Sequence, residues 1–283
     1  MAAPTAGSMA ALAPGGMAQL ELALLLDALY HGFGHDYRGH DRVMVADRLR
    51  ALIDARSLAS MSALQERLLR DDGVARDVVR ALAAAPAGLF DDPAETRELR
   101  ALLAGLHASA APKIWLAGCT SAAEAWTLAI VLAGEGLGAR TQVFATCADD
   151  ALTQDMRNAR MPAAALAHSQ ERYRLGGGAG ALADFFEIDG ELARPRPQLR
   201  ERITWATYSL VTDASFNEFD AILGNRALPG FGAALRQRAL NLFYDSLVRL
   251  GVLALDRQMA PADAHASSYQ AIGAQGHWYK RVA

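Results

Sequence analysis

The chain has 283 residues, of which 52% are hydrophobic, so it can bury a full core as one large domain or two smaller ones. Its 28 basic and 31 acidic residues are mixed along the chain, which argues against nucleic acid or an anionic membrane as a partner. Two cysteines are too few for the disulfide framework of a small secreted protein. No stretch reaches the ~18 apolar residues of a membrane span. These features indicate a cytoplasmic globular protein.

The N-terminal third of the chain is predicted to be helical. Residues 1–18 are small and lack a basic segment ahead of an apolar one, so we expect a disordered tail and no signal peptide. Over 19–107 the apolar residues recur with helical spacing, and Ser60 or Ser62 is placed to cap one of the helices. The sequence therefore predicts an N-terminal all-helical domain over 19–107.

Beyond residue 112, apolar runs alternate with helical patterns. The runs read IWLAG, TQVFATC, RITWATYS, FDAILGN and GVLALD, and helices are expected over 122–135, 150–159 and 233–250. This alternation predicts an α/β domain over 112–283, doubly wound around a mostly parallel sheet that binds ligands at the carboxyl ends of its strands. The Gly- and Pro-rich segment 161–202 is an excursion of loop and β structure, with a hairpin expected around Asp189-Gly190.

The stretch AGCTSAAEAW, residues 117–126, follows an apolar run and leads into a helical pattern. A strand, a tight turn and a helix N-terminus form the place where α/β proteins hold a nucleotide-like cofactor. This turn, however, has few of the glycines that such a loop normally uses. The stretch therefore raises the question of whether the loop still binds a cofactor.

Several fragments, in this order, resemble one family. They read HDYRG (35–39), LFDDP (89–93), AGCTSAAEAW, FATCADDAL (144–152), LRERITWATYSL (199–210) and FDAILGNRAL (219–228). The order is similar to that of the CheR-type methyltransferases of chemotaxis receptors, which transfer a methyl group from S-adenosylmethionine to receptor glutamates. The resemblance implies a helical domain followed by a Rossmann-like methyltransferase domain. It also implies a receptor or signalling protein as partner, docking on the helical domain or on 161–202.

The same resemblance implies which residues would lie around S-adenosylmethionine or S-adenosylhomocysteine. The cofactor-binding positions are Ala117, Gly118, Cys119, Glu124, Cys147, Ala148, Ser209, Leu210, Asn225 and Arg226. No catalytic residue is assigned, because Asp91 stands where the family has an arginine that reaches the active site. No metal site is expected either, since the histidines show no ligand spacing.

Five departures from the family pattern lie in one cleft, and the two smaller ones are Ser209 at a usual asparagine and Gly224-Asn225-Arg226 where the family has Arg-Asn. Ala122 stands at a turn glycine, and Asp91 reverses a charge beside groups that are themselves carboxylates. Cys147 stands where an acidic residue accepts hydrogen bonds from the ribose, and a thiol is a weak acceptor, which would cost ~1–3 kcal/mol if the hydroxyls stay buried. Asp149 or Asp150 could substitute only through a shifted register.

These departures favour a CheR-like pseudo-enzyme with impaired S-adenosylmethionine binding, or with no cofactor, that works as a binding or regulatory module in bacterial signalling. One alternative is an active methyltransferase of protein glutamates that uses Glu124, Asp149 and Asn225 in compensation. Another is a cleft that binds a different small ligand. We expect Cys119 and Cys147 to be two buried inert thiols, with a redox pair as the alternative.

Overall fold

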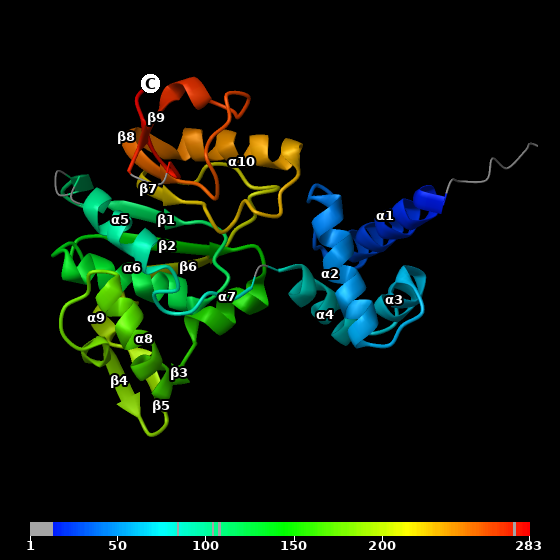
Figure 1. The fold of residues 1–283 in the computed structure, drawn as a ribbon, viewed down its shortest axis with the longest axis horizontal. Helices are drawn as coiled ribbons and strands as arrows, with labels where there is room; N and C mark the ends of the chain where they lie inside the picture. Colours follow the sequence, from blue (N-terminus) through cyan, green and yellow to red (C-terminus); the bar gives the residue numbers. More distant parts are fainter. Residues whose placement is uncertain (1–13, 84, 104, 107–108, 274–275) are drawn as a thin grey trace, which may run out of the picture. The chain divides into compact units, whose positions relative to one another are not determined.

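The computed structural model describes residues 14–83, 85–103, 105–106, 109–273 and 276–283, and its chain divides into two compact units after Ala83. The fold is drawn in Figure 1. The first helix begins at Pro14, inside the range predicted to be a disordered tail. The rest of that range, 1–13, lies outside the described residues, as do 107–108 at the predicted domain boundary.

The predicted helices and strands follow one another in the predicted order, and the structure adds two α-helices inside the excursion over 161–202 and two strands after residue 268 that the sequence did not predict. The helices are α1 (Pro14–Phe33), α2 (Arg42–Ala55), α3 (Met61–Leu68), α4 (Asp72–Leu82), α5 (Pro93–Leu103), α6 (Ala122–Gly134), α7 (Asp150–Arg157), α8 (Ala164–Leu175), α9 (Pro197–Arg200) and α10 (Ala233–Ser246). The strands are β1 (Lys113–Leu116), β2 (Gln142–Cys147), β3 (Met161–Pro162), β4 (Phe186–Asp189), β5 (Leu192–Pro195), β6 (Ile203–Thr207), β7 (Phe219–Leu223), β8 (Leu247–Ala254), β9 (Tyr269–Ile272) and β10 (Trp278–Arg281).

The first unit packs α1 to α4 around one apolar core that includes the fully buried Leu25 and Leu49. Its helices begin at polar caps. The Asp41 side chain accepts the Met44 N–H at 2.8 Å, and Ser60 caps α3, as one reading of the sequence had it. Burying one face of each amphipathic helix is what holds these short helices together, since isolated helices of this length are marginal in water.

The second unit is built on a seven-stranded sheet, in the described residues, with the order β6-β2-β1-β7-β8-β10-β9. The five strands from β6 to β8 are parallel, and β10 runs antiparallel to both of its neighbours. One apolar cluster joins the sheet to α6, and a second joins it to α10, so helices cover both faces (Figure 1). The doubly wound α/β fold predicted from the sequence is confirmed.

The direction of winding changes between β1 and β7. The chain runs from β1 outward through β2 to β6, then returns to pair β7 against the other side of β1. The carboxyl ends of these two strands, at Leu116 and Leu223, therefore border the crevice where doubly wound sheets bind ligands.

The boundary between the units lies after Ala83 and not near residue 107 as the helical pattern suggested. Helix α5 belongs to the second unit because Leu99 and Leu103 pack in the same cluster as α6 and the sheet. Arg100 fixes this docking, since its Nε donates to the Gly176 carbonyl at 2.9 Å and its Nη1 to Glu135 at 2.7 Å. Helical periodicity marks which face of a helix is buried but not which core receives it.

The excursion over 161–202 contains α8 and a small antiparallel sheet with the order β3-β5-β4. The expected hairpin forms between β4 and β5, and Gly190 supplies the positive φ of +60° at its turn. One predicted element is shorter than expected: α10 ends at Ser246, and 247–250 begin β8, where Leu247 pairs with Phe219. Among the described residues, no helix has the length and apolar character of a bilayer span.

Candidate functional site

The turn between β1 and α6 keeps one required glycine. Gly118 has a φ of +68°, and a Cβ placed on it would lie 2.6 Å from the Cβ of Ala227. Both the left-handed backbone and the close approach of the loop after β7 demand glycine here. The backbone of the turn is therefore fixed by the sequence at this position.

The donors of this turn are occupied by Glu124, on the first turn of α6. Its buried carboxylate accepts the Thr120 N–H at 2.9 Å and the Ser121 N–H at 3.2 Å, and also the Thr120 hydroxyl. Burial raises the pKa of Glu124, and the hydrogen bonds from Thr120 oppose this. The Ser121 hydroxyl donates to the Ala87 carbonyl at 2.7 Å. These contacts stabilise the start of the helix.

The last residue of β2, Cys147, offers no carboxylate, and the aspartates that follow it make contacts of their own. Cys147 is buried, and that burial raises the pKa of its thiol, which keeps it neutral. Asp149 caps α7 by accepting the Leu152 N–H at 2.6 Å, and Asp150 accepts the Thr207 hydroxyl at 2.9 Å. Neither aspartate replaces Cys147 at the strand end. Ala148, which separates Cys147 from Asp149, is exposed. This strand end does not fit a ribose that needs a two-oxygen acceptor.

The two cysteines are both free and buried. Cys119, in the turn after β1, donates weakly to the Leu116 carbonyl with an Sγ–O distance of 3.6 Å. Burial raises the pKa of its thiol well above the ordinary value, with Glu124 and Cys147 adding to the effect. Buried neutral thiols are poor nucleophiles, so these contacts agree with two inert side chains.

After β6, Ser209 and Leu210 form a local turn. The Ser209 N–H donates to Asp213 Oδ2 at 3.0 Å, and its hydroxyl accepts the Val211 N–H at 3.2 Å. Leu210 is buried in the cluster beneath α10. Both residues are therefore engaged with their own surroundings.

Asp91, at the family's arginine position, turns toward the excursion. Its Oδ2 accepts the Gly88 N–H at 2.7 Å, and its Oδ1 lies 2.9 Å from Arg172 Nη1 on α8. The preceding Phe90 has a φ of +53°, is buried against Tyr173, and donates its N–H to Thr127 Oγ1 at 3.1 Å. An aspartate here thus ties the segment before α5 to α8.

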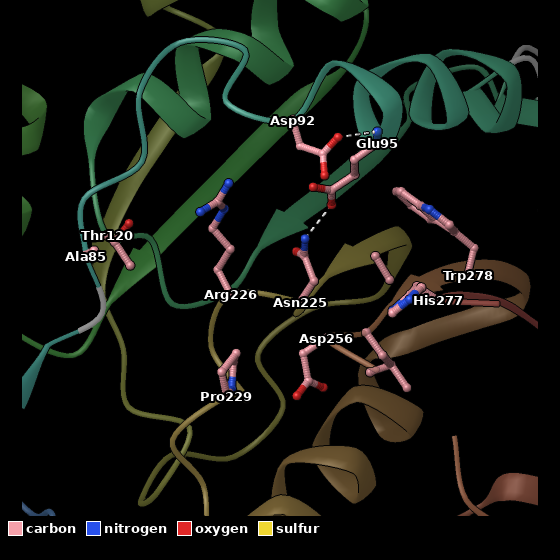
Figure 2. Close-up of a pocket in the computed structure, with 12 residues that line it drawn as sticks. Ala85, Asp92, Glu95, Thr120, Asn225, Arg226, Pro229, Asp256, His277 and Trp278 are labelled. Atoms are coloured by element: carbon pink, nitrogen blue, oxygen red, sulfur yellow. Dashed lines mark hydrogen bonds between the residues drawn. The ribbon is translucent and has the colours of Figure 1, made fainter. Parts of the chain in front are cut away.

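A cavity of about 500 Å³ opens at the carboxyl ends of β1, β7 and β8. It is lined by Ala85, Asp92, Glu95, Thr120, Asn225, Arg226, Pro229, Ala254, Leu255, Asp256, His277 and Trp278 (Figure 2). This is the crevice at the change of winding direction, where a doubly wound sheet binds its ligands. The cavity is therefore the candidate functional site.

Carboxylates dominate the polar walls of this cavity. Asn225 donates to Glu95 Oε1 (Figure 2), and burial raises the pKa of Glu95 while Arg226 opposes that rise. Arg226 Nε lies 3.8 Å from the Oε2 of Glu124 behind it. Asp92 caps α5 by accepting the Glu95 N–H at 2.9 Å. The walls thus carry several acidic groups around one guanidinium.

The floor of the cavity is held by a buried ion pair. Asp256, just after β8, accepts a hydrogen bond from Arg236 Nη1 on α10 at 2.7 Å. The Arg236 side chain is 7% exposed, and its Nε lies 3.7 Å from Asp263 Oδ1. Because a buried arginine must be paired, this network fixes where the Asp256 carboxylate stands.

The structure brings together some of the residues that the sequence analysis assigned to the cofactor. Asn225 and Arg226 line the cavity, and Glu124 contacts Arg226 from behind. The other assigned positions do not line it: Ala117, Gly118, Cys119, Cys147, Ala148, Ser209 and Leu210.

Sequence reasoning missed the ionisable and aromatic residues of the site other than Arg226: Asp92, Glu95, Asp256, His277 and Trp278. Asp92 before Pro93 has the pattern of a helix cap and could have been found. Asp256 follows a predicted strand, which is also a usable signal. Nothing in the local sequence places His277 and Trp278 here, because they lie at the start of an antiparallel strand, β10, near the C-terminus.

Comparisons with known proteins agree with this geometry. Residues 89–260 match the sequence signature described as CheR methyltransferase, SAM binding domain. A Pseudomonas putida protein named as the methyltransferase Cher3 is 30% identical over 237 residues, 83% of this chain and 87% of that protein. A Listeria innocua chemotaxis protein methyltransferase is 28% identical over 154 residues, 53% of this chain and 56% of its own. An uncharacterised 104.1 kDa protein of Rhodobacter capsulatus is 24% identical over 220 residues, covering 75% of this chain but 22% of that protein.

Proposed function

Because the chain belongs to the CheR methyltransferase family, we propose that it keeps the methyltransferase fold, binds S-adenosylmethionine weakly, and acts as a binding or regulatory module in bacterial signalling. The proposal rests on the end of β2, where Cys147 offers a buried neutral thiol to the ribose. Losing a paired acceptor for buried hydroxyls costs about 1–3 kcal/mol, which corresponds to about 5- to 150-fold in affinity.

The neighbouring carboxylates do not compensate for this loss. Asp149 is used as the cap of α7, and Asp150 accepts from Thr207 at the end of β6. Methyl transfer depends on holding the donor against its acceptor, so weak binding of the donor also weakens catalysis. The signalling role is supported by the name of the Listeria innocua relative, a chemotaxis protein methyltransferase.

An active methyltransferase of protein glutamates is the second candidate, and one observation favours it. The turn after β1 keeps Gly118 in a left-handed conformation with its neighbour Ala227 in close contact, so the backbone frame for a cofactor is intact. A divergent set of side chains on that frame would still hold S-adenosylmethionine if contacts elsewhere offset the missing ribose acceptor.

Calorimetric titration of the full chain with S-adenosylmethionine and with S-adenosylhomocysteine separates the two candidates. We expect dissociation constants of hundreds of micromolar or weaker, and about tenfold or greater tightening in Cys147→Asp, since a carboxylate restores a charge-assisted acceptor. Ala148→Asp adds the same charge one residue further along, at an exposed position, and is the matched control. Micromolar binding by the unmodified chain would overturn the proposal in favour of an active enzyme.

A test of the Asp91 position, in the segment before α5, needs two substitutions made together. Asp91→Arg alone would place a second guanidinium beside Arg172, whose Nη1 now lies 2.9 Å from the Asp91 carboxylate. Asp91→Arg combined with Arg172→Asp exchanges the two charges and keeps the ion pair. If the double variant tightens binding of S-adenosylmethionine while Arg172→Asp alone does not, the arginine position itself contributes to the weak binding.

A further inference from the structure

The ionisable side chains that line the cavity are unbalanced in charge. Asp92, Glu95 and Asp256 stand on its walls against the single guanidinium of Arg226, counting Lys, Arg, Asp and Glu in the described part of the chain. Glu124, 3.8 Å behind Arg226, offsets even that one positive charge. Arg236 likewise offsets Asp256 from behind at 2.7 Å, so the remaining negative charge of the walls comes from Asp92 and Glu95, and it disfavours a ligand that brings a further negative charge.

Each of the three carboxylates spends one oxygen on a structural donor. Asp92 Oδ1 accepts the Glu95 N–H at 2.9 Å, Glu95 Oε1 accepts the Asn225 amide, and Asp256 Oδ1 accepts from Arg236 at 2.7 Å. None of the described residues donates a hydrogen bond to Asp92 Oδ2, Glu95 Oε2 or Asp256 Oδ2. The cavity therefore presents three anchored carboxylates, each with an acceptor oxygen to spare.

Two arginines near the cavity are directed elsewhere, which leaves Arg226 as the guanidinium on its walls in the described part of the chain. Arg172 is paired with Asp91 toward α8, and Arg236 is buried beneath the cavity against Asp256 and Asp263. Figure 2 shows Glu95 bonded to Asn225 beside the Arg226 side chain, with Asp256 below them in the view. Acidic groups thus face the cavity from two sides.

We propose that this cavity selects a primary ammonium group, such as the side chain of a lysine, and rejects the carboxylate of a glutamate. The inference rests on the proposed function only in taking the cavity at the carboxyl ends of β1 and β7 as the binding site. An ammonium is a cation that donates hydrogen bonds and accepts none, so it suits walls that carry unused carboxylate oxygens. Trp278 adds an aromatic wall of the kind that attracts cations.

The volume leaves room for the stem that carries the ammonium. A cavity of about 500 Å³ is at the small end of the range for ligand sites and exceeds what an ammonium alone would fill. The same ammonium chemistry could come from a protein side chain or from a free polyamine. The test must therefore distinguish these two sources.

Matched capped tripeptides test the charge preference directly. Acetyl-Gly-Lys-Gly-amide, acetyl-Gly-Glu-Gly-amide and spermidine are titrated separately into the isotope-labelled full chain, and shifts of the Trp278 indole N–H and the Asn225 side-chain amide are followed by NMR. We expect saturable shifts with the lysine peptide and none with the glutamate peptide at equal concentration. Equal response to both peptides, or a response to glutamate alone, would overturn the proposal. Saturation by spermidine at least tenfold tighter than the lysine peptide would assign the polyamine as source.

Two charge-removing variants keep the structural hydrogen bonds. Asn is as good a helix cap as Asp, so Asp92→Asn keeps α5, and Glu95→Gln keeps an oxygen for Asn225. Each is expected to weaken lysine-peptide binding about tenfold, since a charged partner of the ammonium is lost. Glu187→Gln removes one charge from the same unit at the β4–β5 hairpin, outside the cavity, and should leave binding unchanged. Equal losses in all three variants would refute a specific site.

The test separates this inference from the proposed function. Titration of the same samples with S-adenosylmethionine reports on the cofactor, whereas the peptides report on the charge preference. Micromolar cofactor binding together with lysine preference overturns only the proposed function. Weak cofactor binding with no lysine preference overturns only the inference.

Discussion

Replacing Gly118 by alanine is expected to destabilise the second unit by about 2–5 kcal/mol. Holding an L-residue in the left-handed region costs roughly 1–2 kcal/mol, and overpacking a close contact adds about 1–3 kcal/mol. Both costs apply here, because φ is +68° and the new Cβ would lie 2.6 Å from the Ala227 Cβ and 3.0 Å from its Cα. Neither neighbouring atom is the end of a flexible side chain, so the backbone itself must move.

The assay is urea unfolding followed by tryptophan fluorescence. All four tryptophans lie in the second unit, so this signal reports on 84–283 and not on the helical unit. Gly136→Ala is the matched control, because Gly136 also has a positive φ, +70°, but nothing within 4 Å of its added Cβ. That control should cost only the backbone strain of about 1–2 kcal/mol.

A second-site change isolates the contact. Ala227→Gly removes the atom that the new Cβ meets at 2.6 Å, so Gly118→Ala with Ala227→Gly should recover the packing part of the loss and leave the strain. If Gly118→Ala costs no more than Gly136→Ala, or if the double change recovers nothing, then the turn is not held by this close approach and the reasoning is refuted.

Three further outcomes are expected. The thiols of Cys119 and Cys147 should resist a thiol-reactive dye in the native protein and react fully once it is unfolded, because burial raises the pKa of both; rapid labelling of native protein would contradict this. Arg236→Met should lower the free energy of unfolding of the second unit by about 3–5 kcal/mol, measured by urea unfolding, because it leaves the Asp256 carboxylate without its charged partner. A loss below about 1 kcal/mol would argue against the buried pair. Burial lowers the pKa of His40 from its ordinary 6.5 to about 4, so its stabilisation is present above pH 6.5 and is lost as the pH falls through 4. The helical unit should therefore lose up to about 3 kcal/mol over that range, measured by amide exchange in α2, and His40→Gln should flatten the dependence; an unchanged slope would exclude His40 as its source.

The order of strands and helices in the second unit could be predicted from the sequence because each element is a local pattern. The run IWL before Gly118 and the apolar helix after Ser121 appear in the structure as β1 and α6. The hairpin at Gly190 was equally readable, since a glycine there supplies the positive φ that the turn needs. Errors arose where a boundary depends on packing, as at the end of α10, where Leu247 leaves the helix to pair with Phe219.

The candidate site was only partly predictable, because its contacts join residues far apart in the chain. Asn225 and Arg226 could be placed at a strand end, but the partner of Asn225 is Glu95, 130 residues earlier. Asp91 lines a smaller pocket that shares Asp92, Glu95, Asn225, Arg226 and Trp278 with the cavity, but the partner of its carboxylate is Arg172, 81 residues later. A side chain's direction follows from the packing around it, and that packing is absent from any local pattern.

The sequence by itself determined the doubly wound sheet, the glycine at residue 118 and the thiol at the end of β2, because periodicity, turn stereochemistry and residue type are local properties. Only the tertiary structure decided that α5 belongs to the second unit and that Asp92, Glu95 and Asp256 converge on one cavity. Those three carboxylates come from the start of a helix, its first turn and the end of a strand. Their convergence depends on how the helix docks against the sheet, and the charge of the cavity follows from that docking.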